Sequence, residues 1–389
     1  MSGSAGDAVH CSDDGMGRLR KRSSATRVAF FFSGMSVAAW APLVPYAKSR
    51  LSVDDAIIGL LLLCLGAGSI GCMPFCRAMV HRYGCRRVII SGAMTIGVSL
   101  PLLATMPTIW TMAGALLLFG VGLGLVDVAM NVHAVLVEQA SGRRLMSGFH
   151  GMFSVGGIVG SVSTTALLSV GATPIQVACG VAALIGGLIV RFVSGFLTCG
   201  AEERHAKAVF PTGIVALMGA IALCAFIVEG AMLDWSALFL TAVKGCKPER
   251  AGFGYGAFAI AMTIARLRGD ILVTRLGARV VISVGGGVGM VGLVMAVCAP
   301  TSLFSIAGFA ISGIGCGNIV PLLFASAGRQ RAMAPTAAIA TLTTLGYGGG
   351  LAGPAVIGLL AHATGLAAAF LLLALLLGVA AFAGRKLDV

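Results

Sequence analysis

Three acidic side chains lie well inside long apolar segments and could do chemistry there: Asp127, Glu229 and Asp234. A charge at membrane depth is costly, so each is a candidate functional residue. An unpaired carboxyl in apolar surroundings favours its protonated form and can exchange that proton. We find no Lys or Arg at the predicted depth of Glu229, so we predict that Glu229 takes up and releases a proton, and Asp127 is the second candidate for this role. The alternative is a neutral Glu229 hydrogen-bonded to a neighbouring helix.

Other polar groups accompany these acids. Asp127 and Asn131 are four residues apart, hence on one helix face, where they either line a cavity or cap a helix contact. Trp235 follows Asp234, and Trp40 occupies a matching position earlier in the chain. The two indole rings could stack on a sugar-like ring, or they could anchor helices at the membrane interface.

Uncharged hydrogen-bonding groups complete the candidate set. His150 and Ser154 share helical spacing, and His150 is either a proton relay or a structural histidine. Amide and hydroxyl groups suit a neutral polyhydroxy solute, although such groups also join helices. The predicted substrate-binding residues are Trp40, Asn131, Ser154, Asp234, Trp235, Asn318, Thr344 and Tyr347.

The composition sets the environment in which these residues act. Of 389 residues, 58% are hydrophobic and 11% charged, whereas soluble domains carry about 25% charged residues. This excludes a soluble enzyme or a nucleic-acid-binding protein. The 11 cysteines lie mostly in apolar runs and are interpreted as small apolar residues. Without a Walker A sequence or zinc-spaced ligands, we expect no cofactor and no metal.

Long apolar runs without alternation predict membrane-spanning helices of about 20 residues each. The tail 1–26 is expected to be a disordered, basic cytoplasmic segment, and 199–212 a cytoplasmic linker. The twelve predicted spans are 27–47, 57–77, 88–106, 109–136, 147–169, 174–198, 213–243, 251–270, 280–299, 302–326, 334–360 and 363–384.

The distribution of basic residues predicts the orientation. If the N-terminus is cytoplasmic, the inside segments hold 22 of the 27 Lys and Arg residues. Cytoplasmic loops carry an excess of these residues. Both termini are therefore predicted to be cytoplasmic.

The two halves of the chain, 27–198 and 213–389, resemble each other at a nearly fixed offset. RYGCRR, which begins at Arg82, matches RLGAR, which begins at Arg275, 193 residues later. At the same offset, glycines at 120, 122, 124, 156, 157 and 160 match glycines at 313, 315, 317, 349, 350 and 353. Both copies begin on the same side, so the repeat is parallel, as in secondary transporters built from two six-helix halves.

The turn VHRYGCRR resembles the signature loop of the major facilitator superfamily, G-x-x-x-D-R-x-G-R-R. His81 stands at the usual Asp and Arg77 at the usual Gly, while the second copy keeps Gly269-Asp270 before RLGAR. The resemblance implies that these loops gate the cytoplasmic side; the alternative is that they only set topology. The predicted gating residues are Arg82, Gly84, Arg86, Asp270, Arg275, Gly277 and Arg279.

Five further segments resemble the MosC-like/YbjJ-like branch of that superfamily: WAPLVPYAKSRL, GLLLLCLGAGSIGCMP, VDVAMNVHAVLVE, LMSGFHGMFSVGG and EGAMLDWSALFL. The resemblance implies an all-α membrane protein of twelve helices, in two six-helix bundles related by a pseudo-two-fold axis along the membrane normal. It also implies a bacterial inner-membrane location. Substrates of this branch are mostly uncertain, and one member is associated with use of an inositol-derived compound.

We therefore predict a secondary active transporter that works by alternating access, not an enzyme. Its partners are a small solute, protons and the lipid bilayer, and we expect a monomer. Proton symport of a neutral sugar, polyol or inositol-like solute is the first hypothesis, and proton antiport of a drug or metabolite is the alternative. Many antiporters of the superfamily carry a Gly-Pro-rich motif in span 5, and Val155-Gly156-Gly157 lacks its proline.

Overall fold

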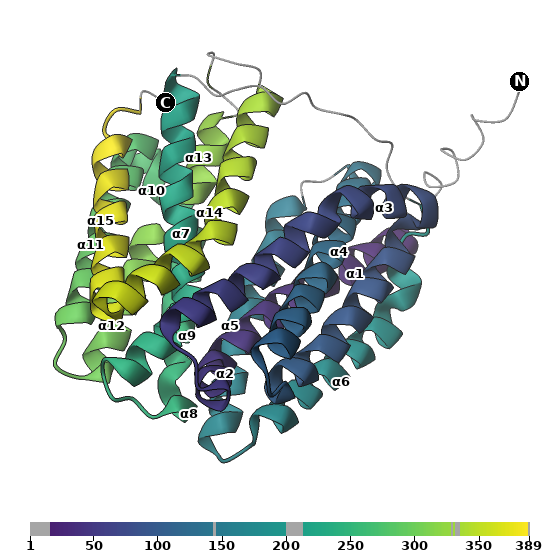
Figure 1. The fold of residues 1–389 in the computed structure, drawn as a ribbon. Helices are drawn as coiled ribbons and strands as arrows, with labels where there is room; N and C mark the ends of the chain where they lie inside the picture. The colour runs from purple at the N-terminus through teal and green to yellow at the C-terminus, as the bar shows by residue number, and fades with distance from the viewer. Residues whose placement is uncertain (1–15, 143–144, 200–212, 328–329, 331–334, 388–389) are drawn as a thin grey trace, which may run out of the picture. The chain divides into compact units, whose positions relative to one another are not determined.

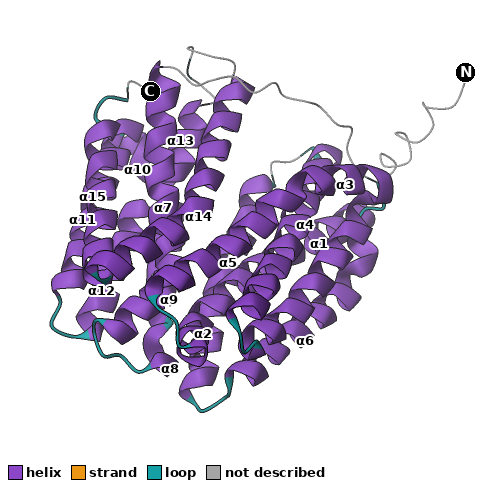
Figure 2. Ribbon diagram, viewed as in Figure 1, coloured by secondary structure: helices purple, strands orange, loops and turns teal. Residues whose placement is uncertain are grey.

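The structure is a computed structural model that describes residues 16–142, 145–199, 213–327, 330 and 335–387. Every regular element in these ranges is a helix (Figure 2). A helix satisfies its own backbone N–H and C=O groups, which water cannot do inside a bilayer. The all-helical architecture expected from the apolar runs is confirmed.

The helices follow the order that the apolar runs predict (Figure 1). The first half of the chain forms α1 (Met16–Trp40), η2 (Ala41–Leu43), α2 (Val44–Leu51), α3 (Asp55–Thr105), α4 (Ile109–Ser141), α5 (Met146–Ser169), α6 (Pro174–Phe192) and η3 (Val193–Gly195). The second half forms α7 (Gly213–Ala242), α8 (Pro248–Ala251), α9 (Phe253–Leu267), α10 (Gly269–Leu276), α11 (Ala278–Cys298), α12 (Ser302–Cys316), α13 (Ile319–Ala327), α14 (Pro335–Thr364) and α15 (Leu366–Gly384).

Eleven helical stretches in the described ranges are long and apolar enough to cross a membrane. The helix α3 holds two of them, Asp55–Met73 and Ala78–Thr105, and its backbone leaves the helical conformation at Gly84, with φ 77° and ψ 162°. The remaining predicted span, 251–270, corresponds to the 15-residue α9. At about 1.5 Å per residue, α9 alone is shorter than the roughly 30 Å hydrocarbon core. The helix α10 continues from it after Arg268.

The prediction of a disordered N-terminal tail is wrong for Met16–Ala25, which forms the beginning of α1. Arg and Lys are good helix formers, so the basic run does not oppose helix formation. The Thr26 hydroxyl at the end of this segment contacts His133 Nδ1 of α4 at 2.9 Å, and His133 is buried. Residues 1–15 and most of the predicted linker, 200–212, lie outside the described ranges.

The chain divides into two compact units that do not coincide with the two sequence copies. The first unit comprises 1–40, 67–160 and 173–204; the second comprises 41–66, 161–172 and 205–389. Two segments of the first copy therefore pack within the second unit. The Ser161 hydroxyl donates to the Gly252 carbonyl at 3.2 Å, and the Ser169 hydroxyl donates to the Glu249 carbonyl at 2.8 Å.

Glycines allow the helices of each unit to approach closely. A Cβ placed on Gly122 of α4 would lie 3.1 Å from the Gly92 carbonyl oxygen of α3. In the second unit, a Cβ on Gly315 of α12 would lie 2.4 Å from the Gly285 carbonyl oxygen of α11. Both residues of the second contact are 193 positions after those of the first. The repeated glycines therefore make the same helix contact in each copy.

Candidate functional site

The most polar cluster of the second unit centres on an ion pair between α7 and α9. Arg266 Nη2 lies 3.1 Å from both carboxylate oxygens of Glu229. The Arg266 side chain is 28% exposed and that of Glu229 is 19% exposed. The prediction that Glu229 lacks a basic partner is wrong. Arg266 lies in the last turn of α9, and its long side chain reaches the acid on the neighbouring helix.

A break between α12 and α13 supplies the second acceptor for Arg266. Arg266 Nε donates to the Gly317 carbonyl at 2.9 Å. In a continuous helix this carbonyl would accept from the residue four positions later, which is Pro321. Proline has no backbone N–H, so the carbonyl needs another donor. The sequence thus creates a free acceptor beside Glu229, and the two acceptors together fix the guanidinium.

Asn318, predicted to bind substrate, lies at the same helix break. Its Nδ2 donates to the Ala265 carbonyl at 2.9 Å, and the residue is 7% exposed. A Cβ on Gly269 would come within 2.1 Å of Asn318 Oδ1. These contacts favour the alternative interpretation, in which Asn318 joins helix ends. It positions the α9 terminus that carries Arg266.

Two more polar residues of the second unit lie near the ion pair. Tyr255 of α9 is half-buried and within electrostatic range of Glu229, Arg266 and Asp234. Asp234 is half-buried on α7, one residue before the fully buried Trp235. No hydrogen-bond or ion-pair partner of Asp234 is found among the described residues. This part of the unit therefore holds a paired acid and a second acid that can still accept hydrogen bonds.

In the first unit, the predicted pair Asp127 and Asn131 does form on α4. Asn131 Nδ2 donates to the Asp127 backbone carbonyl at 2.8 Å and lies 3.3 Å from Oδ1. Cys72 and Cys76 of α3 lie near Asp127, with 3.5 Å between their sulfurs. Both Asp127 and Asn131 are half-buried. The i, i+4 spacing in the sequence was enough to predict this contact.

The two tryptophans predicted to bind substrate are buried: Trp40 is 3% exposed and Trp235 is 0% exposed. Neither indole N–H has a hydrogen-bond partner among the described residues. In this structure their rings pack against protein, which favours the packing interpretation over stacking on a solute.

The remaining predicted residues differ in exposure. Ser154 is half-buried on α5 and Thr344 is exposed on α14, while the side chain of Tyr347 lies outside the described part. His150 is exposed near the start of α5, and its ring meets Phe30 edge-on at 5.0 Å between centroids. No contact among the described residues assigns His150 a proton partner.

The predicted gating loops share one backbone conformation. Gly84 has φ 77° and ψ 162°, and Gly277 has φ 79° and ψ 153°. This region is essentially restricted to glycine. The first loop is also fixed by the chain after η3, because Arg86 N–H donates to the Leu197 carbonyl at 2.8 Å. The gating roles of the arginines and of Asp270, which lies in α10, stay predictions.

Sequence reasoning missed Arg266 as a site residue, and also Tyr255 and Gly317. A signal for Arg266 existed, since it falls inside the predicted span 251–270. A charged residue within a span and four positions before its end can extend toward another helix. Gly317 could have been found from the spacing to Pro321, which removes its helical partner.

Comparison with known proteins agrees with this architecture. The family model described as Major Facilitator Superfamily matches residues 28–211. An uncharacterised transporter of the major facilitator type from Yersinia pestis is 46% identical, over 92% of this chain and 94% of its own length. The membrane protein MosC of Rhizobium meliloti is 32% identical, over 90% of this chain and 87% of its own. The chain belongs to the major facilitator superfamily, and its relatives support the MosC-like branch.

Solved structures share the fold at low sequence identity. A variant of the nucleoside transporter NupG has a TM-score of 0.77 at 14% identity, covering 93% of this chain and 98% of its own. A bacterial homologue of the human lysosomal transporter Spinster, in an inward-facing and unoccupied conformation, has a TM-score of 0.74 at 13% identity, covering 96% and 97%. Together with the relatives, these matches identify a multi-pass membrane transporter of two six-helix bundles and not an enzyme.

Proposed function

We propose that this transporter moves a small neutral solute of the sugar, polyol or inositol class together with protons, and that Glu229 carries the coupled proton. The observation that supports the proposal is the ion pair between Glu229 and Arg266 at 3.1 Å, on two helices of the second unit. A proton on Glu229 would remove the charge to which Arg266 binds. Proton uptake and separation of the pair are therefore linked steps.

The link explains how a proton and a solute could bind together. Arg266 has two acceptors, the Glu229 carboxylate and the Gly317 carbonyl. When Glu229 is protonated, its neutral carboxyl is a weaker acceptor for the guanidinium than the carboxylate was, and a partly buried charged donor that loses a charged acceptor is destabilised. A solute hydroxyl can supply a further acceptor. The proton then promotes solute binding, and the states with both or neither bound are favoured.

Transport into proteoliposomes tests this mechanism. Labelled myo-inositol, sorbitol and glucose serve as probes, with trapped pyranine reporting internal pH. We expect one of them to accumulate when the outside is acidified and to acidify the interior as it enters. Glu229→Gln keeps the shape and hydrogen bonding of the protonated acid but cannot release a proton. It should exchange solute between the two sides without accumulating it.

Asp127→Asn is the matched control, because it neutralises the other predicted coupling acid in the first unit. It should accumulate solute like the parent protein. If Glu229→Gln accumulates solute and Asp127→Asn does not, the proton is carried by Asp127. If solute movement drives protons the opposite way, the protein is an antiporter.

We further propose that Asn131, Ser154, Asp234 and Thr344 contact the solute during the cycle. Single cysteines at these positions should be protected from thiol reagents by the transported solute, and unprotected cysteines would exclude those positions. In other conformations of the carrier, we propose that the solute also contacts four further residues: Trp40, Trp235, Asn318 and Tyr347.

Reporter fusions at both ends of the chain test the proposed inner-membrane topology, which requires both termini to be cytoplasmic.

A further inference from the structure

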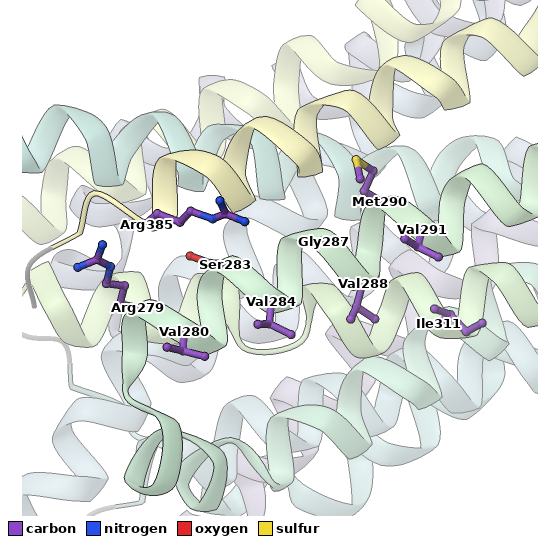
Figure 3. A pocket seen from close by; sticks show the side chains of 10 residues that line it. All are labelled: Arg279, Val280, Ser283, Val284, Gly287, Val288, Met290, Val291, Ile311 and Arg385. Atoms are coloured by element: carbon purple, nitrogen blue, oxygen red, sulfur yellow. The ribbon is translucent and has the colours of Figure 1, made fainter.

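A groove of about 770 Å³ lies on the second unit (Figure 3), and its lining includes neither residue of the ion pair. It is bounded by α11, α12 and the residues after α15, and α11 packs against both of those helices. Its ten lining residues include two arginines and no acidic residue among those the structure describes. Apart from Arg279, a predicted gating residue, its lining residues have no role in the transport mechanism proposed above.

One end of the groove is basic. Arg279 lies in the first turn of α11 and Arg385 directly follows α15, and Figure 3 shows both at the same end. Both residues are exposed. The N-terminus of α11 adds the positive end of a 21-residue helix. This end therefore attracts an anion, and the positive-inside count predicts that it faces the cytoplasm.

The rest of the groove is apolar and has the length of one lipid leaflet. Val280, Val284, Val288 and Val291 form a stripe along α11, and Ile311 of α12 faces it (Figure 3). Eleven residues of helix span about 16 Å, close to half of the roughly 30 Å hydrocarbon core. Val284 is 57% exposed and Val291 is 58% exposed. The stripe can therefore contact an acyl chain over most of its length.

Ser283 and Gly287 shape the region between the basic end and the valines. Ser283 Oγ is shielded from water and has no hydrogen-bond partner among the described residues. A phosphate or ester oxygen in the groove would give this hydroxyl an acceptor. A Cβ placed on Gly287 would meet no atom within 4 Å. The groove is thus open at Gly287, where any side chain would occupy it.

We propose that this groove binds one anionic glycerophospholipid, with its phosphate between Arg279 and Arg385 and one acyl chain along the valine stripe. Charge complementarity selects the anionic lipid. Juxtamembrane Lys and Arg residues attract anionic lipid, whereas a zwitterionic headgroup brings its own cation to the two guanidinium groups. A phosphate near a helix N-terminus is also favoured by the unpaired N–H groups.

The test compares two lipids with identical acyl chains, phosphatidylglycerol and phosphatidylcholine. Each is added to the purified full-length protein in neutral detergent, and native mass spectrometry counts the bound lipids. We expect one phosphatidylglycerol to be retained at least tenfold more strongly than phosphatidylcholine. The double variant Arg279→Gln/Arg385→Gln should lose most of this preference. Equal retention of both lipids by the parent protein would overturn the proposal.

Two further variants separate a built site from general charge. Arg191→Gln removes an exposed arginine of α6, outside the groove, and should leave lipid retention unchanged. Gly287→Phe keeps both arginines but fills the groove, so it should also lose the bound phosphatidylglycerol. If Arg191→Gln weakens retention as much as the double variant, only net charge attracts the lipid. If Gly287→Phe retains it fully, the acyl chain does not occupy the groove.

Discussion

The two copies of the repeat share their close helix contacts and differ in their polar residues. A Cβ on Gly124 would meet the Ser69 carbonyl oxygen at 2.6 Å, and a Cβ on Gly317 would meet the Met262 carbonyl oxygen at 2.9 Å. Both members of the second contact lie 193 residues after the first. The positions where backbones touch were therefore kept in both copies after duplication.

The polar residues follow no such rule. At the offset of 195 that matches Trp40 with Trp235, Glu229 corresponds to Gly34, where a Cβ would lie 2.1 Å from the Phe153 carbonyl oxygen. At the offset of 193, Arg266 corresponds to Met73 and Asp127 to Val320. Each copy thus has its own polar cluster on a common scaffold. The difference teaches that close backbone contacts constrain both copies equally, whereas charged groups are needed in one copy only.

The largest expected effect concerns the ion pair that only the second copy has. Arg266→Gln should abolish solute accumulation, reducing it more than about 100-fold, because Glu229 loses its partner. Removing one partner of a fully buried pair costs about 3–5 kcal/mol. Solvent reaches both side chains here, so we expect the free energy of unfolding to fall by about 2 kcal/mol. Thermal unfolding of the variant in detergent measures this loss.

The double variant Glu229→Gln/Arg266→Gln provides the control for this prediction. It removes the uncompensated charge and should recover most of the lost stability without recovering accumulation. If the double variant is less stable than the parent protein by the sum of the two single-variant losses, the two side chains do not interact and the comparison between the copies fails at this position.

The next effect compares two glycines with the same backbone conformation. A Cβ on Gly84 would lie 1.9 Å from the Thr198 carbonyl oxygen, whereas one on Gly277 would meet no atom within 4 Å. Gly277→Ala should therefore lower the free energy of unfolding only by the cost of backbone strain, about 1–3 kcal/mol. Gly84→Ala should lower the free energy of unfolding by about 1–3 kcal/mol more than Gly277→Ala does, because the backbone at Thr198, after η3, must move. Thermal unfolding of both variants measures the difference; equal losses would show that the contact with Thr198 is loose.

The smallest effects concern the contacts between the copies within the second unit. The Ser161 hydroxyl bonds to Gly252 in a buried position, so Ser161→Ala should cost about 1–3 kcal/mol. The pair of His362 Nδ1 and Asp54 Oδ2, 3.3 Å apart, has side chains 56% and 45% exposed. Asp54→Asn should therefore cost less than about 1 kcal/mol. A larger loss for Asp54→Asn than for Ser161→Ala would reverse this ranking.

Local patterns in the sequence predicted much of this architecture. The apolar runs located the helices, the repeated glycines revealed the duplication, and the i, i+4 spacing placed Asp127 and Asn131 on one helix face. The partner of Glu229 was not predicted, because Arg266 lies 37 residues away in sequence and on a different helix. The same limit applied to Trp40 and Trp235, whose position in the repeat was evident but whose burial depends on the helices that surround them.

The sequence by itself determined the membrane environment and the duplicated architecture, because these depend on composition and on local periodicity. Only the tertiary structure decided which charges meet. A long arginine side chain can reach several helices, and the acceptor that holds it arises where Pro321 leaves the Gly317 carbonyl without its helical donor. The pairing of Glu229 with Arg266 therefore depends on how three helices pack, which no single segment of the sequence specifies.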